Sequence, residues 1–373
     1  MGMRRRALTV ILAVLATACS NGSHPAANRR AATSLSNAPS STTLTTVPPP
    51  ATTTSASSAS STTSSPPVAT TIGGAKRRPG VGAGGGAGVV APAAGSSGAT
   101  IAGCPLFPAD NAWRRDVSHD ALDPHSAAWV ANIGAATHVH PDFGSDPTYG
   151  IPYIVVPANQ PKVPITFTAY GDEADPGPYP VPRDAPIESG SDHHVLVASA
   201  DCHLYEMFDA SPNNRGGWDA AVGAVFDLRS NKLRPDTWTS ADAAGLPILP
   251  GLVRWDEVQS GHIDHALRFT IARTQRGFIH PATHQAGSTT DASVAPMGAR
   301  FRLRADFDIS HFTGASRVVL ECLRRYGMFV ADNGSNWYIS GSTDTRWNDS
   351  DLNQLKSVPG SAFEVVATGT VQH

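Results

Sequence analysis

The sequence predicts a mainly β fold, a β-sandwich of the jelly-roll kind with a few short helices, and an α+β fold is the alternative. Apolar and polar residues alternate in several short segments, such as His203-Leu-Tyr-Glu-Met-Phe208. This two-residue period is typical of strands with one buried face. Stretches rich in proline and glycine, such as Asp175-Pro-Gly-Pro-Tyr-Pro-Val-Pro182, separate these segments and indicate turns. Few stretches show the longer period of an amphipathic helix.

These signals place the elements in order along the chain. Strands are predicted at 165–169, 195–197, 203–208, 224–228, 266–271, 300–307, 328–331 and 337–340. Helices are predicted at 126–133, 252–259, 315–326 and 349–356. The third helix has the clearest pattern, because Val319, Cys322 and Leu323 form one apolar stripe and Gly327 follows as a C-terminal stop.

The N-terminus has the pattern of an export signal. Three arginines precede a short apolar run, and small residues then lead to Cys19. The apolar run is about ten residues long, roughly half of what spans a bilayer. The placement of Cys19 resembles the lipobox of bacterial lipoproteins, which implies that residues 1–19 are a lipoprotein signal peptide and that Cys19 is lipidated. We therefore expect an extracytoplasmic protein, lipid-anchored to the cell membrane; an ordinary secretory signal is the alternative.

Residues 20–100 consist almost entirely of Ser, Thr, Ala, Pro and Gly and contain no aromatic residue. Such a stretch cannot bury enough apolar surface to offset the entropy lost on ordering, so it is predicted to be a disordered tether spanning on the order of 50 Å. A glycosylated stalk is the alternative. All 26 aromatic residues lie in 101–373, which we predict to be a single globular ectodomain.

Charge and cysteine content restrict the partners and the redox environment. The net charge is only −3, and the predicted domain has no run of basic residues, so no nucleic-acid partner is expected. Contact with the membrane is expected only through the lipid. A disulfide is permitted outside the cytoplasm, and we predict that Cys104 pairs with Cys202, whereas Cys322 packs within the third helix. Three free thiols are the alternative.

Glu206 is the first candidate catalytic residue. It shares a predicted strand face with Leu204 and Phe208, and a carboxyl group among apolar neighbours has the raised pKa that a general acid needs. Aspartates at the ends of nearby strands, including Asp332, could supply the second carboxylate that glycoside hydrolysis requires. In the alternative interpretation Glu206 faces solvent and the aspartates cap turns.

A second group contains His265, Arg268 and His284. A histidine base beside an arginine that neutralises a carboxylate would suit β-elimination on a uronic-acid polymer. The alternative is a buried histidine satisfied by the backbone, with arginines in surface ion pairs.

Paired histidines raise the question of a metal. His138 and His140 would share one face of a strand, and His193 and His194 are adjacent, but no Cys, Asp or Glu accompanies them at a diagnostic spacing. We predict no metal and no cofactor.

Asp332, Asn333, Trp337 and Tyr338 form the candidate substrate-binding group. Aromatic faces stack on apolar sugar faces, while amides and carboxylates bind hydroxyls. The alternative is a hairpin whose tryptophan belongs to the core.

Several longer motifs resemble a family of secreted actinobacterial and other soil-bacterial proteins to which no activity is assigned. They include Asp110-Asn-Ala-Trp113, His140-Pro-Asp-Phe-Gly144, Asp264-His-Ala-Leu-Arg268 and Tyr326-Gly-Met-Phe-Val-Ala-Asp-Asn333. The resemblance spans nearly all of 104–366. It implies one intact extracytoplasmic domain and carries no catalytic residues over.

Together these observations favour a cell-surface lipoprotein whose β-rich ectodomain binds polysaccharide or cell-wall glycan. In the enzymatic version of this hypothesis it also cleaves the polymer, as a hydrolase or a lyase. The alternative is a non-catalytic lipoprotein that binds carbohydrate or cell wall, or a structural component of the envelope.

Overall fold

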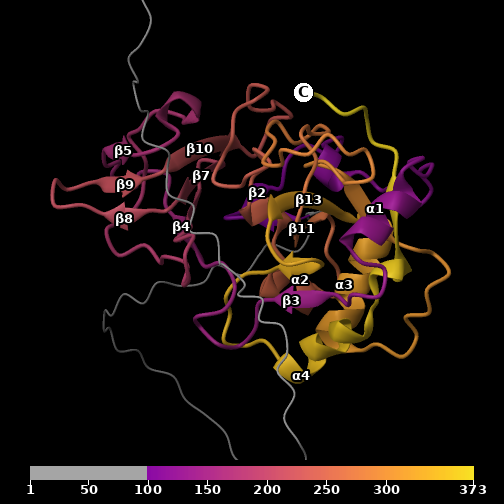
Figure 1. Ribbon diagram of the computed structural model, residues 1–373. Coiled ribbons are helices and arrows are strands. Elements are labelled where there is room, and N and C mark those ends of the chain that lie inside the picture. The colour runs from indigo at the N-terminus through magenta and orange to yellow at the C-terminus, as the bar shows by residue number, and fades with distance from the viewer. Residues whose placement is uncertain (1–98) are drawn as a thin grey trace, which may run out of the picture. The chain divides into compact units, whose positions relative to one another are not determined.

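The computed structural model describes residues 99–373, and these form a mainly β fold with a few short helices (Figure 1). This part of the fold prediction is confirmed. Both larger sheets contain parallel as well as antiparallel pairs, which makes the arrangement a β-rich α+β one. The predicted signal peptide, Cys19 and all but the last two residues of the predicted tether lie outside the described residues.

The largest sheet has six strands in the order β15-β12-β13-β11-β14-β3. Its strands are β3 (His140–Asp142), β11 (Leu267–Ile271), β12 (Arg300–Leu303), β13 (Met328–Asn333), β14 (Tyr338–Ser340) and β15 (Phe363–Val366). β11 runs parallel to β13 and antiparallel to β14, and β14 runs parallel to β3. The sheet therefore joins a strand from the start of the domain to strands from its end.

A second sheet has four strands in the order β10-β7-β6-β4, and a third has the order β5-β9-β8. Their strands are β4 (Tyr153–Val156), β6 (Val195–Ser199), β7 (His203–Phe208), β10 (Val222–Asp227), β5 (Ile165–Phe167), β8 (Ser211–Pro212) and β9 (Trp218–Ala220). β1 (Thr100–Ile101) and β2 (Cys104–Pro105) form a short pair. In Figure 1 the three-stranded sheet lies at one end, beside the four-stranded sheet.

The described residues contain four α-helices: α1 (Ser126–Ile133), α2 (Trp255–Ser260), α3 (Gly314–Arg325) and α4 (Asp349–Leu352). Helices α1 and α3 pack against strands of the six-stranded sheet, and α2 and α4 pack against α3. Short 3₁₀ turns are η1 (Ala112–Arg114), η2 (Gly171–Glu173), η3 (Leu249–Gly251), η4 (Asn353–Ser357) and η5 (Gly360–Ala362). All four predicted helices are present, and the last continues as η4. None of the helices in residues 99–373 is long and apolar enough to cross a membrane.

Helix α3 spans Gly314–Arg325, within one residue of the predicted helix at 315–326. Val319, Leu320, Cys322 and Leu323 are buried along one stripe. Gly327 follows with a φ of +67°, and a Cβ there would lie 2.3 Å from the carbonyl oxygen of Phe301. Only glycine therefore fits this stop without strain.

The four-stranded sheet separates two hydrophobic clusters. Leu196 and Leu204 face the larger cluster, which also contains the apolar face of the six-stranded sheet, whereas Val197 and Tyr205 face the smaller one. Alternate residues of β6 and β7 thus pack on opposite faces, as the two-residue period predicts. This explains why every residue of β6 is buried.

The cysteines behave as predicted. Cys104 and Cys202 form a disulfide across a sequence separation of 98 residues, which ties β2 to the turn between β6 and β7. Cys322 is free and buried in α3.

Candidate functional site

Polar side chains cover one face of four neighbouring strands, β13, β11, β14 and β3. Thr270 lies opposite Asp332 on one side and Tyr338 on the other, and Tyr338 lies opposite His140. Two residues further along β14 and β3, Ser340 lies opposite Asp142. Because side chains alternate across a sheet, these residues share one face, which also carries Arg268. The intervening residues Phe269, Ile271 and Ile339 are in the core.

A β-bulge brings Asp332 onto this face. Phe269 pairs with Val330, but the next residue of β11, Thr270, pairs with Asp332, so Ala331 is the extra residue. Without the bulge, Asp332 would be out of step with Thr270 and would point to the opposite face. Bulges commonly redirect a side chain in this way.

The polar face is the floor of a pocket of about 440 Å³. This volume falls within the range of ~300–1,000 Å³ that is typical of small-ligand sites. The loop at 188–194 and the segment at 148–151 supply the walls. Four of the predicted site residues line this pocket together: Arg268, Asp332, Asn333 and Tyr338.

Arg268 is held at the base of the pocket. Its Nε donates to Oδ2 of Asp242 at 3.1 Å, and its Nη1 donates to Oγ of Ser340 at 2.6 Å. The side chain is only 4% exposed, and no described residue accepts a hydrogen bond from Nη2. An arginine fixed by two partners in this way can offer its remaining N–H groups to a ligand without further ordering.

His194 and Glu188 form a charged pair at the wall. The imidazole Nδ1 lies 2.5 Å from Oε2 of Glu188, and Nε2 lies 3.0 Å from the carbonyl oxygen of Ala241. A carbonyl can only accept, so Nε2 carries a proton, and the contact with Glu188 favours a second proton on Nδ1. Burial opposes the charge of His194, but the bond to Glu188 outweighs it and raises the pKa of the imidazole.

Asp332 forms no ion pair with any other residue of the described domain. Burial and the nearby Asp242 raise its pKa from the usual 3.8 to about 7, although Arg268 acts in the opposite direction. Its Oδ1 accepts a hydrogen bond from the backbone N–H of Asn333 at 2.6 Å. Asp332 is therefore a carboxyl group that exchanges a proton near neutral pH, which is the property of a general acid.

Tyr149 and Tyr338 line the pocket, and the ring of His140 lies against both of them outside the lining. The rings of His140 and Tyr338 stack with centroids 4.2 Å apart, and Nε2 of His140 lies 2.6 Å from Oη of Tyr149. Burial and the carboxylate of Asp142 raise the pKa of Tyr149, so its hydroxyl keeps its proton. This part of the pocket offers hydroxyl groups and ring edges to a ligand.

Glu206 is not in this pocket. As predicted, it is buried among apolar residues, and burial raises its pKa to about 7. Its carboxylate accepts hydrogen bonds from the backbone N–H groups of Ile248 and Leu249 at 2.8–3.0 Å. It therefore joins β7 to the start of η3 and lies behind the site, where no substrate reaches it.

The two predicted catalytic histidines do not converge with Glu206. His265 is fully buried, with Nδ1 near the carbonyl of Ala266 and Nε2 3.1 Å from the carboxylate of Glu257. Nδ1 of His284 lies 2.7 Å from the carbonyl of Ala243. Neither histidine lines the pocket that contains Arg268, so an elimination mechanism with His265 as its base does not fit.

The proposed role of Trp337 in stacking against a sugar is wrong. Trp337 is 0% exposed, packs against Phe269, Phe301 and Phe363, and donates from Nε1 to the carbonyl of Gly134. Trp337 comes directly before β14 and has a left-handed backbone conformation with a φ of +62°. Its side chain is in the core, whereas Tyr338, the first residue of the strand, lines the pocket.

The histidine pairs do not form a metal site. His138 is exposed and outside the pocket, and His140 stacks on Tyr338. Within residues 99–373 no group of three or more His, Cys, Asp or Glu side chains is arranged to hold a metal ion.

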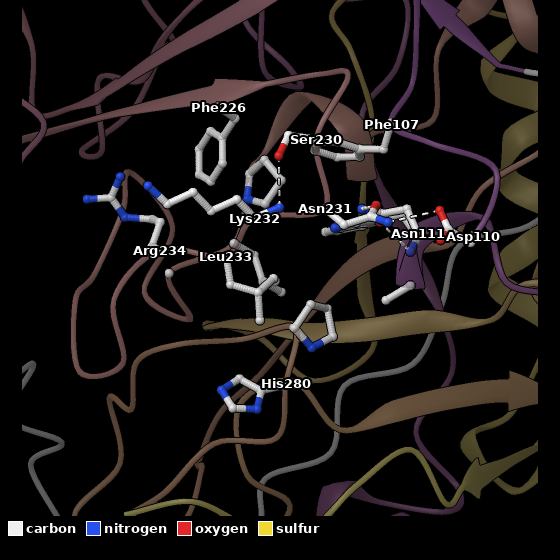
Figure 2. Close-up of a pocket in the computed structure, with 16 residues that line it drawn as sticks. Phe107, Asp110, Asn111, Phe226, Ser230, Asn231, Lys232, Leu233, Arg234 and His280 are labelled. Atoms are coloured by element: carbon white, nitrogen blue, oxygen red, sulfur yellow. Dashed lines mark hydrogen bonds between the residues drawn. The ribbon is translucent and has the colours of Figure 1, made fainter.

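A second pocket, of about 270 Å³, is mostly apolar (Figure 2). Phe107, Phe226 and Leu233 contribute to its lining, and hydrogen bonds link Asn231 to both Asn111 and Asp110 at one side. None of the site residues predicted from the sequence lines it. The polar pocket is therefore the stronger candidate for the functional site.

Several residues that build the polar pocket were not predicted as site residues: Asp142, Tyr149, Glu188, Asp242, Thr270 and Ser340. His194 was considered only as a possible metal ligand. A signal for some of them was present. Polar residues two apart flank an apolar one in His140-Pro-Asp142, Arg268-Phe-Thr270 and Tyr338-Ile-Ser340. Each pattern indicates a strand with a polar face over a buried one.

No protein-family model, curated protein or solved structure matches this chain.

Proposed function

We propose that this protein is a cell-surface lipoprotein that binds a glycan in the polar pocket of its six-stranded sheet. The observation that carries the proposal is the row of hydrogen-bonding side chains on one sheet face, with Arg268 fixed among them. Sugars present many hydroxyl groups that both donate and accept hydrogen bonds. A pocket with hydroxyl, amide, carboxyl and guanidinium groups around aromatic ring edges matches that chemistry.

Binding to a panel of plant, fungal and bacterial glycans tests this proposal. The purified protein should bind at least one of them, measured by isothermal titration calorimetry. Tyr149→Phe removes one pocket hydroxyl and should weaken binding about fivefold or more, since a hydrogen bond is worth ~1 kcal/mol. Tyr170→Phe is the matched control, because Tyr170 is also exposed but lies outside the pocket. Equal loss of affinity in both variants, or no binding to any glycan, would contradict the proposal.

A second candidate function, hydrolysis of the bound glycan, is favoured by the acid–base properties of Asp332. Glycosidases need a second carboxylate within roughly 10 Å of the acid. Asp142 lies three strands away from Asp332, about 14 Å at ~4.8 Å per strand, which is too far. Glu188 is bound to His194, so Asp192 is the remaining pocket carboxylate that could activate water.

Product analysis distinguishes hydrolysis from binding alone. If Asp332 is the acid, new reducing ends should appear with the natural protein, and Asp332→Asn should abolish them while glycan is still bound. Unchanged product formation by Asp332→Asn would exclude this mechanism.

A further inference from the structure

The charges around the polar pocket are unevenly balanced. Its two cationic side chains, Arg268 and His194, are each already paired, with Asp242 and Glu188 respectively. Within each pair the positive and negative charges largely cancel, so neither Arg268 nor His194 provides a free positive charge. Arg268 keeps only its Nη2 for a ligand, as a hydrogen-bond donor.

Three other carboxyl groups line the pocket, those of Asp142, Asp192 and Asp332. None of them forms an ion pair with any residue of the described domain. Asp332 accepts a bond from a backbone N–H, and Asp192 accepts one from the hydroxyl of Ser191. The pocket therefore carries excess negative charge that the protein itself does not compensate.

We infer that the preferred ligand is a glycan with free, protonated amino groups, an inference that rests on the proposed function of the pocket. An ammonium group supplies the positive charge that Asp332 and its neighbours lack, while adjacent sugar hydroxyls accept from Nη2 of Arg268. A uronic acid would instead place a carboxylate among three carboxyl groups, and an N-acetylated sugar would bring no charge. Like charges in a partly buried site repel, which selects against the uronate.

The same arrangement makes binding depend on pH. The groups that act on Asp332 are Asp242, Arg268 and His194, together with the backbone N–H of Asn333. In the free protein they leave its pKa at about 7. A ligand ammonium favours the ionised carboxylate, so binding releases a proton. Affinity should therefore rise with pH up to the pKa of the ligand's amino group and fall above it.

Three glycan series of equal length test this inference on the purified full chain: free-amine chitosan oligomers, N-acetylated chitin oligomers and oligogalacturonate. We expect chitosan oligomers to bind at least tenfold more tightly than chitin oligomers at pH 7, and oligogalacturonate not to bind. Chitin or galacturonate binding as tightly as chitosan would overturn the inference but leave glycan binding intact. If neither these oligomers nor the wider glycan panel binds, the proposed function itself fails.

Variants that each remove one carboxylate test which pocket residues select the amino glycan. Asp332→Asn and, separately, Asp192→Asn should each reduce the chitosan-to-chitin affinity ratio, with Asp332→Asn bringing it close to one. Asp192 is on an exposed loop, so its replacement does not endanger folding. Asp172→Asn is the matched control, because this exposed carboxylate on η2 is outside the pocket. An unchanged ratio in both pocket variants would overturn the inference.

Discussion

Two carboxyl groups of this domain, the fully buried Glu206 and the partly buried Asp332, have strongly raised pKa values. Both have a pKa of about 7, and burial is the main cause for each. Their settings differ, because Glu206 is enclosed behind the pocket and Asp332 lines it. A raised pKa alone therefore shows only that a carboxyl group is buried. A carboxyl group with a raised pKa is a candidate functional residue only if it also lines a cavity, as Asp332 does.

The raised pKa of Glu206 should make the stability of the domain depend on pH. Its pKa rises from 4.5 to about 7 on folding, so the folded state holds the proton more tightly. The stabilisation is complete below pH 4.5 and is lost as the pH rises through about 7. The free energy of unfolding should therefore fall between pH 5 and pH 8, by up to about 3 kcal/mol from this group, since one pKa unit is worth ~1.4 kcal/mol.

Urea unfolding at several pH values measures this slope. Glu206→Gln should make it clearly shallower without abolishing it, because Asp332, Asp242 and His194, whose pKa values are also raised, contribute in the same direction. A natural protein whose stability is constant or rises from pH 5 to pH 8 would contradict the assignment.

Arg268 depends on Asp242 for its position and its charge balance. Asp242→Ala would leave a buried guanidinium with only the hydroxyl of Ser340 as a partner. We expect a loss of about 3–5 kcal/mol in the free energy of unfolding, the usual cost of removing one member of a buried pair. Chemical denaturation measures it. Asp172→Ala, on the surface, should change stability by less than ~0.5 kcal/mol.

At the scale of single elements, local patterns predicted structure well. The apolar stripe and Gly327 correctly delimited α3, and the alternation in β7 correctly placed Glu206 beside Leu204. These features depend only on neighbours along the chain. The register of β14 was less clear, and taking Trp337 and Tyr338 together hid the fact that they face opposite sides of the sheet.

The N-terminus of α3 depends on a residue from another element. Thr313 makes no capping bond, and instead Asp351 of α4 accepts from the backbone N–H of Ala315 at 2.6 Å. Asp351→Ala should cost about 1 kcal/mol, because the cap and its favourable charge at the helix start are lost. Urea unfolding measures it, with Glu321→Ala as a control on the exposed face of α3 that should cost no more than ~0.5 kcal/mol.

At the scale of the whole molecule, sequence alone could not assemble the pocket. Its floor joins β3, from the start of the domain, to β11, β13 and β14, and its wall comes from the loop at 188–194. Pairing between distant strands leaves no local signal, and the bulge that brings Asp332 into the pocket depends on the register with β11. Arg268, Asp332, Asn333 and Tyr338 could be named individually, but not placed together with Glu188, His194 and Asp242.

The disulfide should contribute strongly to overall stability. Cys104 and Cys202 are separated by 98 residues, and closing a long loop removes much entropy from the unfolded chain. The Cys104→Ser, Cys202→Ser double variant should lose about 2–4 kcal/mol in the free energy of unfolding. Denaturation of the natural protein with and without reductant provides an independent measurement. A difference below ~1 kcal/mol in both experiments would contradict this expectation.

The strand order of the six-stranded sheet also has a consequence for how the protein matures. β3 completes the floor by pairing with β14, so the segment made early must wait for one made near the end of synthesis. Such non-local pairing raises the contact order and slows folding. The cavity should consequently be among the last parts of the domain to form, and a nascent or truncated chain that ends before β14 would lack part of the cavity floor.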